Sequence, residues 1–205
     1  MKQNFCPLVL TILLLGLPVT SSTASAPAGA TESQSLDGPW QIVFDPANEG
    51  GAKQWVRGEN FPREQGREIA VPSCWELFEK DYEGVAFYRR AFTVPKGWQG
   101  KVVRLQFDAV NFRAEVWLND TAVGSHEGGF TPLEFRVDDL LKFDGENTLI
   151  VRVVGPILIE DKRVDGMGPM ETPQWRGAIA GGIWQPVRLI ATGDVYVKDV
   201  FVETR

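Results

Sequence analysis

The stretch VRLQFD, Val103–Asp108, alternates apolar and polar side chains at every step, and in AEVWL, Ala114–Leu118, the same period of two puts Ala114, Val116 and Leu118 on one face. Successive side chains of a β-strand point to opposite faces of its sheet, so a period of two predicts a strand with one buried and one solvated face. We therefore expect Val103, Leu105 and Phe107 to lie on the buried face of one strand, and the second stretch to form another.

Seven segments in all are rich in β-branched and aromatic residues and are bounded by Gly, Pro, Asp or Asn, which is typical of strands. They are Trp40–Phe44, Ala86–Val94, Lys101–Phe107, Ala114–Leu118, Leu149–Val154, Val187–Ala191 and Val195–Val202. Helical signals are few: Ser73 and Glu76 fit a capping box, and Asp138–Leu141 fits a single turn. Many short strands without crossover helices predict an all-β fold, an antiparallel sandwich or jelly roll.

Composition and charge exclude several classes of protein. The 205 residues are 43% hydrophobic and 23% charged, as in a globular protein, and carry a formal net charge of -6. Because no basic stripe interrupts the sequence, nucleic acid is not an expected partner. A (β/α)₈ barrel needs about 200 to 250 residues and eight helices, so it does not fit in this chain.

The first 30 residues are interpreted as a signal peptide. Lys2 precedes the apolar run Leu8–Leu17, which is too short to span a bilayer, and small residues follow it. Cleavage after Ala24, Ala28 or Ala30 would each satisfy the small-x-small rule, and residues 31–205 would form one domain. We expect an exported protein, periplasmic or extracellular, with no membrane segment after cleavage. Cys74 would then be the only cysteine, so no internal disulfide is expected.

A long segment without periodicity separates the last strands. The 28 residues between Val154 and Ile183 are rich in Gly and Pro and include Trp175 and Arg176. Loops longer than about 12 to 15 residues in compact domains are usually functional or disordered. We expect this loop to meet a ligand or a partner domain.

Four stretches, in order and spacing, resemble the amino-terminal domain of glycoside hydrolase family 2, the family of β-galactosidases, β-glucuronidases and β-mannosidases. The stretches are Leu36–Trp40; Val71–Glu76 with Phe87–Pro95; Ala114–Asn119 through Val123–Pro132 to Gly145–Leu149; and Gly181–Leu189. The resemblance covers essentially the whole chain after the signal peptide. It implies a galactose-binding-domain-like jelly-roll β-sandwich, which in the family precedes an immunoglobulin-like sandwich and a (β/α)₈ barrel.

The resemblance also implies where the chemistry lies. Family members hydrolyse β-glycosides with retention, using two glutamates of the barrel, and the acid follows an Asn. Asn-Glu occurs here only at Asn48–Glu49, in a Gly-rich turn, so we assign no catalytic residue. No metal or cofactor is assigned either, because the single histidine cannot form a zinc site alone and the acidic residues match no EF-hand spacing. Residues 195–205 resemble the strand that leads towards the immunoglobulin-like domain. The chain is thus interpreted as a fragment of a longer enzyme, with those two further domains as its partners.

Four residues are predicted to bind substrate. Trp175 and Arg176 resemble the family's loop that reaches the rim of the barrel's active site, and His126 and Glu127 belong to its His-x-Gly-Gly-aromatic turn. Some members also place an acidic residue in this loop, for which Asp161, Asp165 and Glu171 are candidates by proximity only. The structural alternatives are that Trp175 packs the loop down, that Arg176 is solvated and that His126 orders its turn by a hydrogen bond.

Aromatic side chains stack on the apolar faces of sugars, so the other tryptophans are weighed as well. Trp40, Trp75 and Trp117 lie in or beside strand-like runs and are interpreted as core residues. Trp55, Trp98 and Trp184 stay as weaker candidates for contact with sugar, with Trp98 expected at the tip of a turn and Trp184 packed at the start of a strand.

Three functions remain open from the sequence. The first is the non-catalytic sugar-binding domain of an exported family 2 glycosidase. The second is a free-standing secreted carbohydrate-binding module that holds a glycan with the long loop. The third is an interaction sandwich whose pocket is vestigial.

Overall fold

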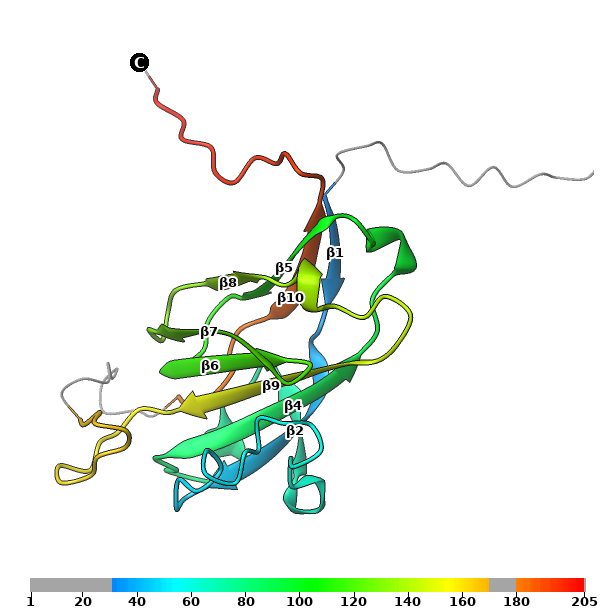
Figure 1. Cartoon of the computed structure of the whole chain (residues 1–205). Helices are drawn as coiled ribbons and strands as arrows, with labels where there is room; N and C mark the ends of the chain where they lie inside the picture. Colours follow the sequence, from blue (N-terminus) through cyan, green and yellow to red (C-terminus); the bar gives the residue numbers. More distant parts are fainter. Residues whose placement is uncertain (1–30, 170–179, 205) are drawn as a thin grey trace, which may run out of the picture.

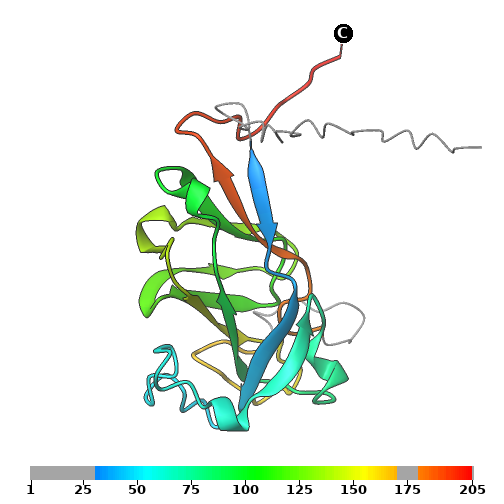
Figure 2. The same ribbon diagram turned by 90° about the vertical axis from the view of Figure 1, so that its right-hand side faces the viewer.

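Residues 31–169 and 180–204 are described by the computed structural model, and they form two antiparallel sheets with a shared core (Figures 1 and 2). The four-stranded sheet has the order β1-β10-β5-β8 and the six-stranded sheet the order β3-β2-β4-β9-β6-β7. The strands are β1 (Glu32–Ser35), β2 (Gly38–Asp45), β3 (Arg67–Val71), β4 (Val85–Phe92), β5 (Val102–Phe107), β6 (Arg113–Leu118), β7 (Thr121–Glu127), β8 (Leu133–Arg136), β9 (Asn147–Val154) and β10 (Val187–Thr192). This is the expected jelly-roll β-sandwich.

Helical structure in the described part of the chain is confined to four single turns. These 3₁₀ helices are η1 (Arg63–Gln65), η2 (Trp75–Leu77), η3 (Lys96–Trp98) and η4 (Asp138–Leu140). The predicted turn at Asp138 is confirmed, whereas the predicted capping box is wrong. The Ser73 hydroxyl donates to the carbonyl of Ala70, and the Glu76 carboxylate accepts from the distant backbone of Gly181.

The main core lies between the two sheets. β5 and β10 pair in register, with Leu105 opposite Leu189 and Phe107 opposite Val187, and all four side chains are buried. Apolar residues alternate along β5 and β6 as predicted, because each of these strands has one face on the core. Trp40 and Trp75 are also buried here, as expected.

A second apolar cluster covers part of the outer face of the six-stranded sheet. Phe87 of β4 and Ile150 of β9 point outwards and pack under Trp55, Phe61 and Ile157 from the flanking loops. The Trp55 and Phe87 rings meet edge to face with centroids 5.4 Å apart. β9 is therefore buried on both faces, which explains why Leu149–Val154 is apolar at every position except Arg152.

The predicted strand over Val195–Val202 is absent from the structure. Residues 195–204 leave the sandwich beyond β10 in extended form without secondary structure (Figure 1). A strand exists only where a neighbouring backbone completes its hydrogen bonds, and the described residues offer this segment none. Phe201 is 92% exposed, while the ring of Tyr196 lies 3.8 Å from the Arg104 guanidinium carbon. No helix within the described ranges is long and apolar enough to cross a membrane.

Candidate functional site

Both described ends of the long loop cross the same tryptophan ring. Trp75 is fully buried, and a Cβ placed on Gly155 would lie 2.7 Å from its Cη2. A Cβ placed on Gly181 would lie 2.5 Å from its Cζ2. Real Cβ atoms do not approach this closely, so the backbone can pass over the ring only as glycine. The two glycines therefore bring the loop back to one point above the core.

Hydrogen bonds hold the returning end of the loop at this point. The backbones of Asn111 and Gly182 exchange two bonds of 2.9 Å, and the Asn111 side-chain amide donates to the carbonyl of Ala180 at 2.9 Å. The Gly181 N–H donates to Glu76 Oε1 at 2.8 Å, and the Gly181 carbonyl accepts from the backbone N–H of Trp75. We call Trp75, Glu76, Asn111, Gly181 and Gly182 the loop-base cluster.

The loop-base cluster keeps polar atoms that are buried and unsatisfied. Glu76 Oε2 and Asn111 Oδ1 are buried and have no hydrogen-bond partner among the described residues. Such an atom costs about 1 to 3 kcal/mol when no partner is supplied, so these positions are suited to a polar ligand or to water. Burial raises the pKa of Glu76, and the negative charge of nearby Asp81 raises it further. The hydrogen bond from the Gly181 N–H lowers this pKa but offsets the rise only in part. Burial, followed by the charge of Glu76, also raises the pKa of Cys74.

An aromatic pair borders the loop-base cluster. The Phe130 and Trp184 rings meet edge to face with centroids 5.5 Å apart, and the Trp184 indole donates to the carbonyl of Gly129 at 2.8 Å. A Cβ on Gly129 would lie 2.8 Å from Asn111 Cγ, so the pair directly adjoins the cluster. Phe130 is 57% exposed. The site thus combines a solvent-accessible aromatic ring with the half-buried side chain of Glu76 and the buried amide of Asn111.

The predicted residues His126 and Glu127 point to opposite faces of β7. His126 lies opposite Ala114, whose side chain faces the core, and its Nε2 is 3.0 Å from Thr131 Oγ1. Glu127 lies opposite Arg113 and forms an ion pair with it on the outer face at 2.5 Å. One ligand cannot contact both side chains from one side of the sheet.

Other predicted residues divide between the described and undescribed parts of the chain. Trp175, Arg176 and Glu171 lie outside the described residues, and their role stays a prediction. Asp161 is exposed, and Asp165 forms an ion pair with Arg152 on the outer face.

Of the remaining tryptophans, Trp98 and Trp117 lie elsewhere than expected, whereas Trp184 packs shortly before β10 as expected. Trp55 is buried within the second cluster, and Trp98, expected at a turn tip, is buried with its indole bonded to Glu32. Trp184 is half-buried at the site, whereas Trp117, interpreted as core, is half-buried on the outer face. Trp117 follows Val116, which faces the core, so the alternation of β6 places it outside.

No group of three or more His, Cys, Asp or Glu residues within 31–169 and 180–204 is arranged to hold a metal ion. Neither Asn111 nor Phe130 was predicted as a site residue, and Glu76 was interpreted as a cap. Their places at the site depend on contacts with residues 54 to 105 positions away in the sequence, for which local patterns give no signal.

The two antiparallel sheets place this chain among the jelly-roll sandwiches, a fold class that includes many lectin domains. Residues 77–193 match the sugar binding domain of glycosyl hydrolases family 2. The chain belongs to this family.

Its relatives are longer glycosidases. The chain is 35% identical over 124 residues to a β-galactosidase of Thermoanaerobacter pseudethanolicus, covering 60% of this chain and 16% of the relative. It is 25% identical over 190 residues to a β-glucuronidase of Paenibacillus borealis, covering 84% and 31%. The structure of Ruminococcus gnavus β-glucuronidase in complex with uronic deoxynojirimycin superimposes with a TM-score of 0.69 at 27% identity, covering 80% and 30%. The chain therefore spans less than a third of each.

Proposed function

We propose that this chain is the non-catalytic sugar-binding domain of an exported family 2 glycosidase that acts on a β-glycoside. In this proposal the loop-base cluster and its aromatic pair form one side of a glycan site, and the hydrolytic carboxylates belong to a barrel outside these 205 residues. The observation that carries the proposal is the anchoring of both ends of the long loop on Trp75, beside the exposed ring of Phe130. An aromatic surface with a few fixed polar groups is typical of sugar recognition.

The state of the carboxyl groups supports a non-catalytic role. Retaining hydrolysis needs a carboxylic acid held protonated about 5 to 5.5 Å from a carboxylate nucleophile. Among the described residues, the carboxyl whose pKa is raised is that of Glu76, and one of its oxygens already accepts the Gly181 N–H. Its position is that of a loop support rather than of an acid free to protonate a leaving group.

The first test is hydrolysis by the purified chain. We expect no turnover of 4-nitrophenyl β-galactoside, β-glucuronide or β-mannoside above a buffer control. Turnover that disappears in Glu76→Gln would contradict the proposal, because it would assign acid catalysis to this chain. A Gly145→Ala preparation, altered in an exposed loop, controls for contaminating hydrolases.

Further domains of the same enzyme are the partners we propose. The apolar side chains exposed after β10, including those of Val195, Val197 and Phe201, support this, because a row of exposed apolar groups is typical of an interface. An immunoglobulin-like domain and a barrel would be these partners, as the family resemblance implies.

Export is proposed from the apolar run near the amino terminus. We expect amino-terminal sequencing of the native product to begin after Ala24, Ala28 or Ala30. A native product that retains Lys2 and the apolar run after it would contradict export by signal cleavage.

A further inference from the structure

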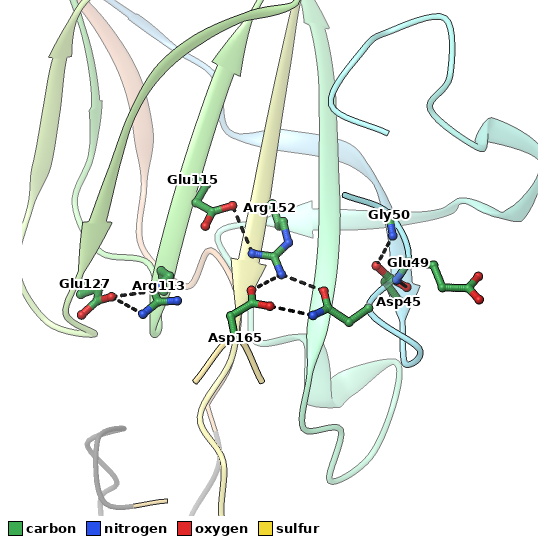
Figure 3. A network of polar contacts seen from close by, with 9 residues as sticks. Asp45, Glu49, Gly50, Arg113, Glu115, Glu127, Arg152 and Asp165 are labelled. Carbon is green, nitrogen blue, oxygen red and sulfur yellow. Dashed lines mark hydrogen bonds and ion pairs between the residues drawn. The ribbon is translucent and has the colours of Figure 1, made fainter. Parts of the chain in front are cut away.

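A hollow of about 390 Å³ lies on the outer face of the six-stranded sheet. Its floor carries Glu115 and Trp117 from β6 and Arg152 from the adjacent strand β9, while Asn48 and Asp165 come from two loops. Figure 3 shows the Arg152 guanidinium between the carboxylates of Glu115 and Asp165. The hollow thus joins residues far apart in the sequence, and it lies on the face opposite the main core.

The polar groups of this hollow are fixed before any ligand arrives. The Arg152 side chain is only 7% exposed and donates to Glu115 Oε2 at 3.1 Å, to Asp165 Oδ2 at 2.5 Å and to Asn48 Oδ1 at 2.8 Å. The Asn48 amide in turn donates to Asp165 Oδ1 at 2.8 Å. A ligand therefore meets side chains whose rotamers are already restricted, which lowers the entropic cost of binding.

Two groups of the hollow are left for a ligand. Trp117 is half-buried and lines the hollow, so part of its side chain stays open to a ligand. Glu115 uses one carboxylate oxygen for Arg152, and its side chain remains 31% exposed. The indole can stack on the apolar face of a sugar ring, and the carboxylate can accept from a hydroxyl.

The charge of the hollow selects against anions. Two carboxylates and one guanidinium give a formal charge of -1, and the guanidinium is already bonded to both carboxylates. The neighbouring pair of Arg113 and Glu127 adds no net charge. A uronic acid would bring a second negative charge to carboxylates that only accept hydrogen bonds, whereas a neutral polyol donates to them.

We propose that this hollow is a binding site for a neutral saccharide of one or two sugar units, with Trp117 as its stacking platform and Glu115 as its hydrogen-bond acceptor. The volume is near the lower end of the range for small-molecule sites, about 300 to 1,000 Å³. The site lies apart from the loop-base cluster, so it does not rest on the function proposed above.

The test is a titration of the full chain, labelled with ¹⁵N, with methyl β-D-glucoside, methyl β-D-galactoside and cellobiose, and separately with glucuronic acid. The indole N–H signal of Trp117 is assigned by its loss in Trp117→Phe. We expect at least one neutral saccharide to shift this signal in a saturable way, with weaker binding of glucuronic acid. Trp117→Ala is expected to weaken the neutral saccharide at least about tenfold.

Controls separate this site from other surfaces. Phe201→Ala removes a more exposed ring after β10 and should leave the affinity unchanged. The far-ultraviolet circular dichroism of Trp117→Ala should match that of the unmodified chain, because this side chain lies outside both apolar clusters. The proposal is overturned if no neutral saccharide gives saturable shifts, if Trp117→Ala binds normally, or if glucuronic acid binds as tightly. A loss of affinity in Trp184→Ala with none in Trp117→Ala would move the sugar to the loop base and overturn it as well.

Discussion

Replacement of Gly155 by alanine tests whether the backbone truly passes over the Trp75 ring. The added Cβ would lie 2.7 Å from Trp75 Cη2, about 1 Å closer than an ordinary carbon contact. The ring cannot easily move away, because it is fully buried and packs edge to face against Phe44 and Tyr82 with centroids 6.1 and 5.5 Å apart. Overpacking of this kind costs about 1 to 3 kcal/mol. We expect a loss of about 2 kcal/mol in the free energy of unfolding.

The assay is urea unfolding followed by tryptophan fluorescence, with thermal unfolding as a second measure. A loss of about 2 kcal/mol corresponds to a Tm lower by about 4 to 8 °C for a chain of this size. Gly145→Ala is the matched control, because Gly145 lies before the same strand, β9, and a Cβ there would meet nothing within 4 Å. It should be neutral or stabilising by up to about 1 kcal/mol. Equal stability of the two variants would refute the described path over Trp75.

Two further predictions follow from the shifted carboxyl groups. Glu76→Gln removes a carboxyl group whose pKa is raised in the folded chain. The protonated carboxyl group contributes its full stability to the fold below the pKa that Glu76 has in the unfolded chain. This contribution is lost as the pH rises through the folded pKa. The stability of this variant relative to the unmodified chain should therefore increase from about pH 4 to pH 7 in urea titrations, and a flat or falling difference would contradict the raised pKa. Burial alone would raise the pKa of Asp165, but hydrogen bonds from Arg152 and Asn48 lower it, so its contribution is present above about pH 4 and is lost as the pH falls through its folded pKa. Asp165→Asn should cost about 1 to 2 kcal/mol at pH 7, with a smaller difference in acid, and a cost that grows in acid would show that the ion pair does not stabilise the fold.

The central strands could be predicted from the sequence and the edge strands could not. Six of the seven predicted segments correspond to β2, β4, β5, β6, β9 and β10, all of which lie inside a sheet. The four strands that were not predicted are the two edges of each sheet, β1 and β8 in one and β3 and β7 in the other. Edge strands bury fewer side chains: β1 reads Glu-Ser-Gln-Ser and β7 has no fully buried residue. Their pairing depends on a neighbour that is distant in the sequence, so composition gives little signal.

The site was predictable only in its general location. The length of the loop between β9 and β10 points to the end of the sandwich at which the loop-base cluster lies, because long loops in compact domains are commonly functional. The contacts that organise its base join Glu76 to Gly181 and Asn111 to Ala180, which no short motif encodes. Trp117 illustrates a different error: a tryptophan in a strand was taken for core although the alternation of Val116 and Leu118 places it outside.

The proposal that this chain is one domain of a longer glycosidase is tested most directly by the intact mass of the native product in its own host. The 205 residues have a mass of 22.8 kDa and span between 16% and 31% of the relatives compared above. The proposal predicts a native product several times heavier than 22.8 kDa that contains peptides of this chain. A native product slightly below 22.8 kDa would contradict it and would favour a free-standing carbohydrate-binding module.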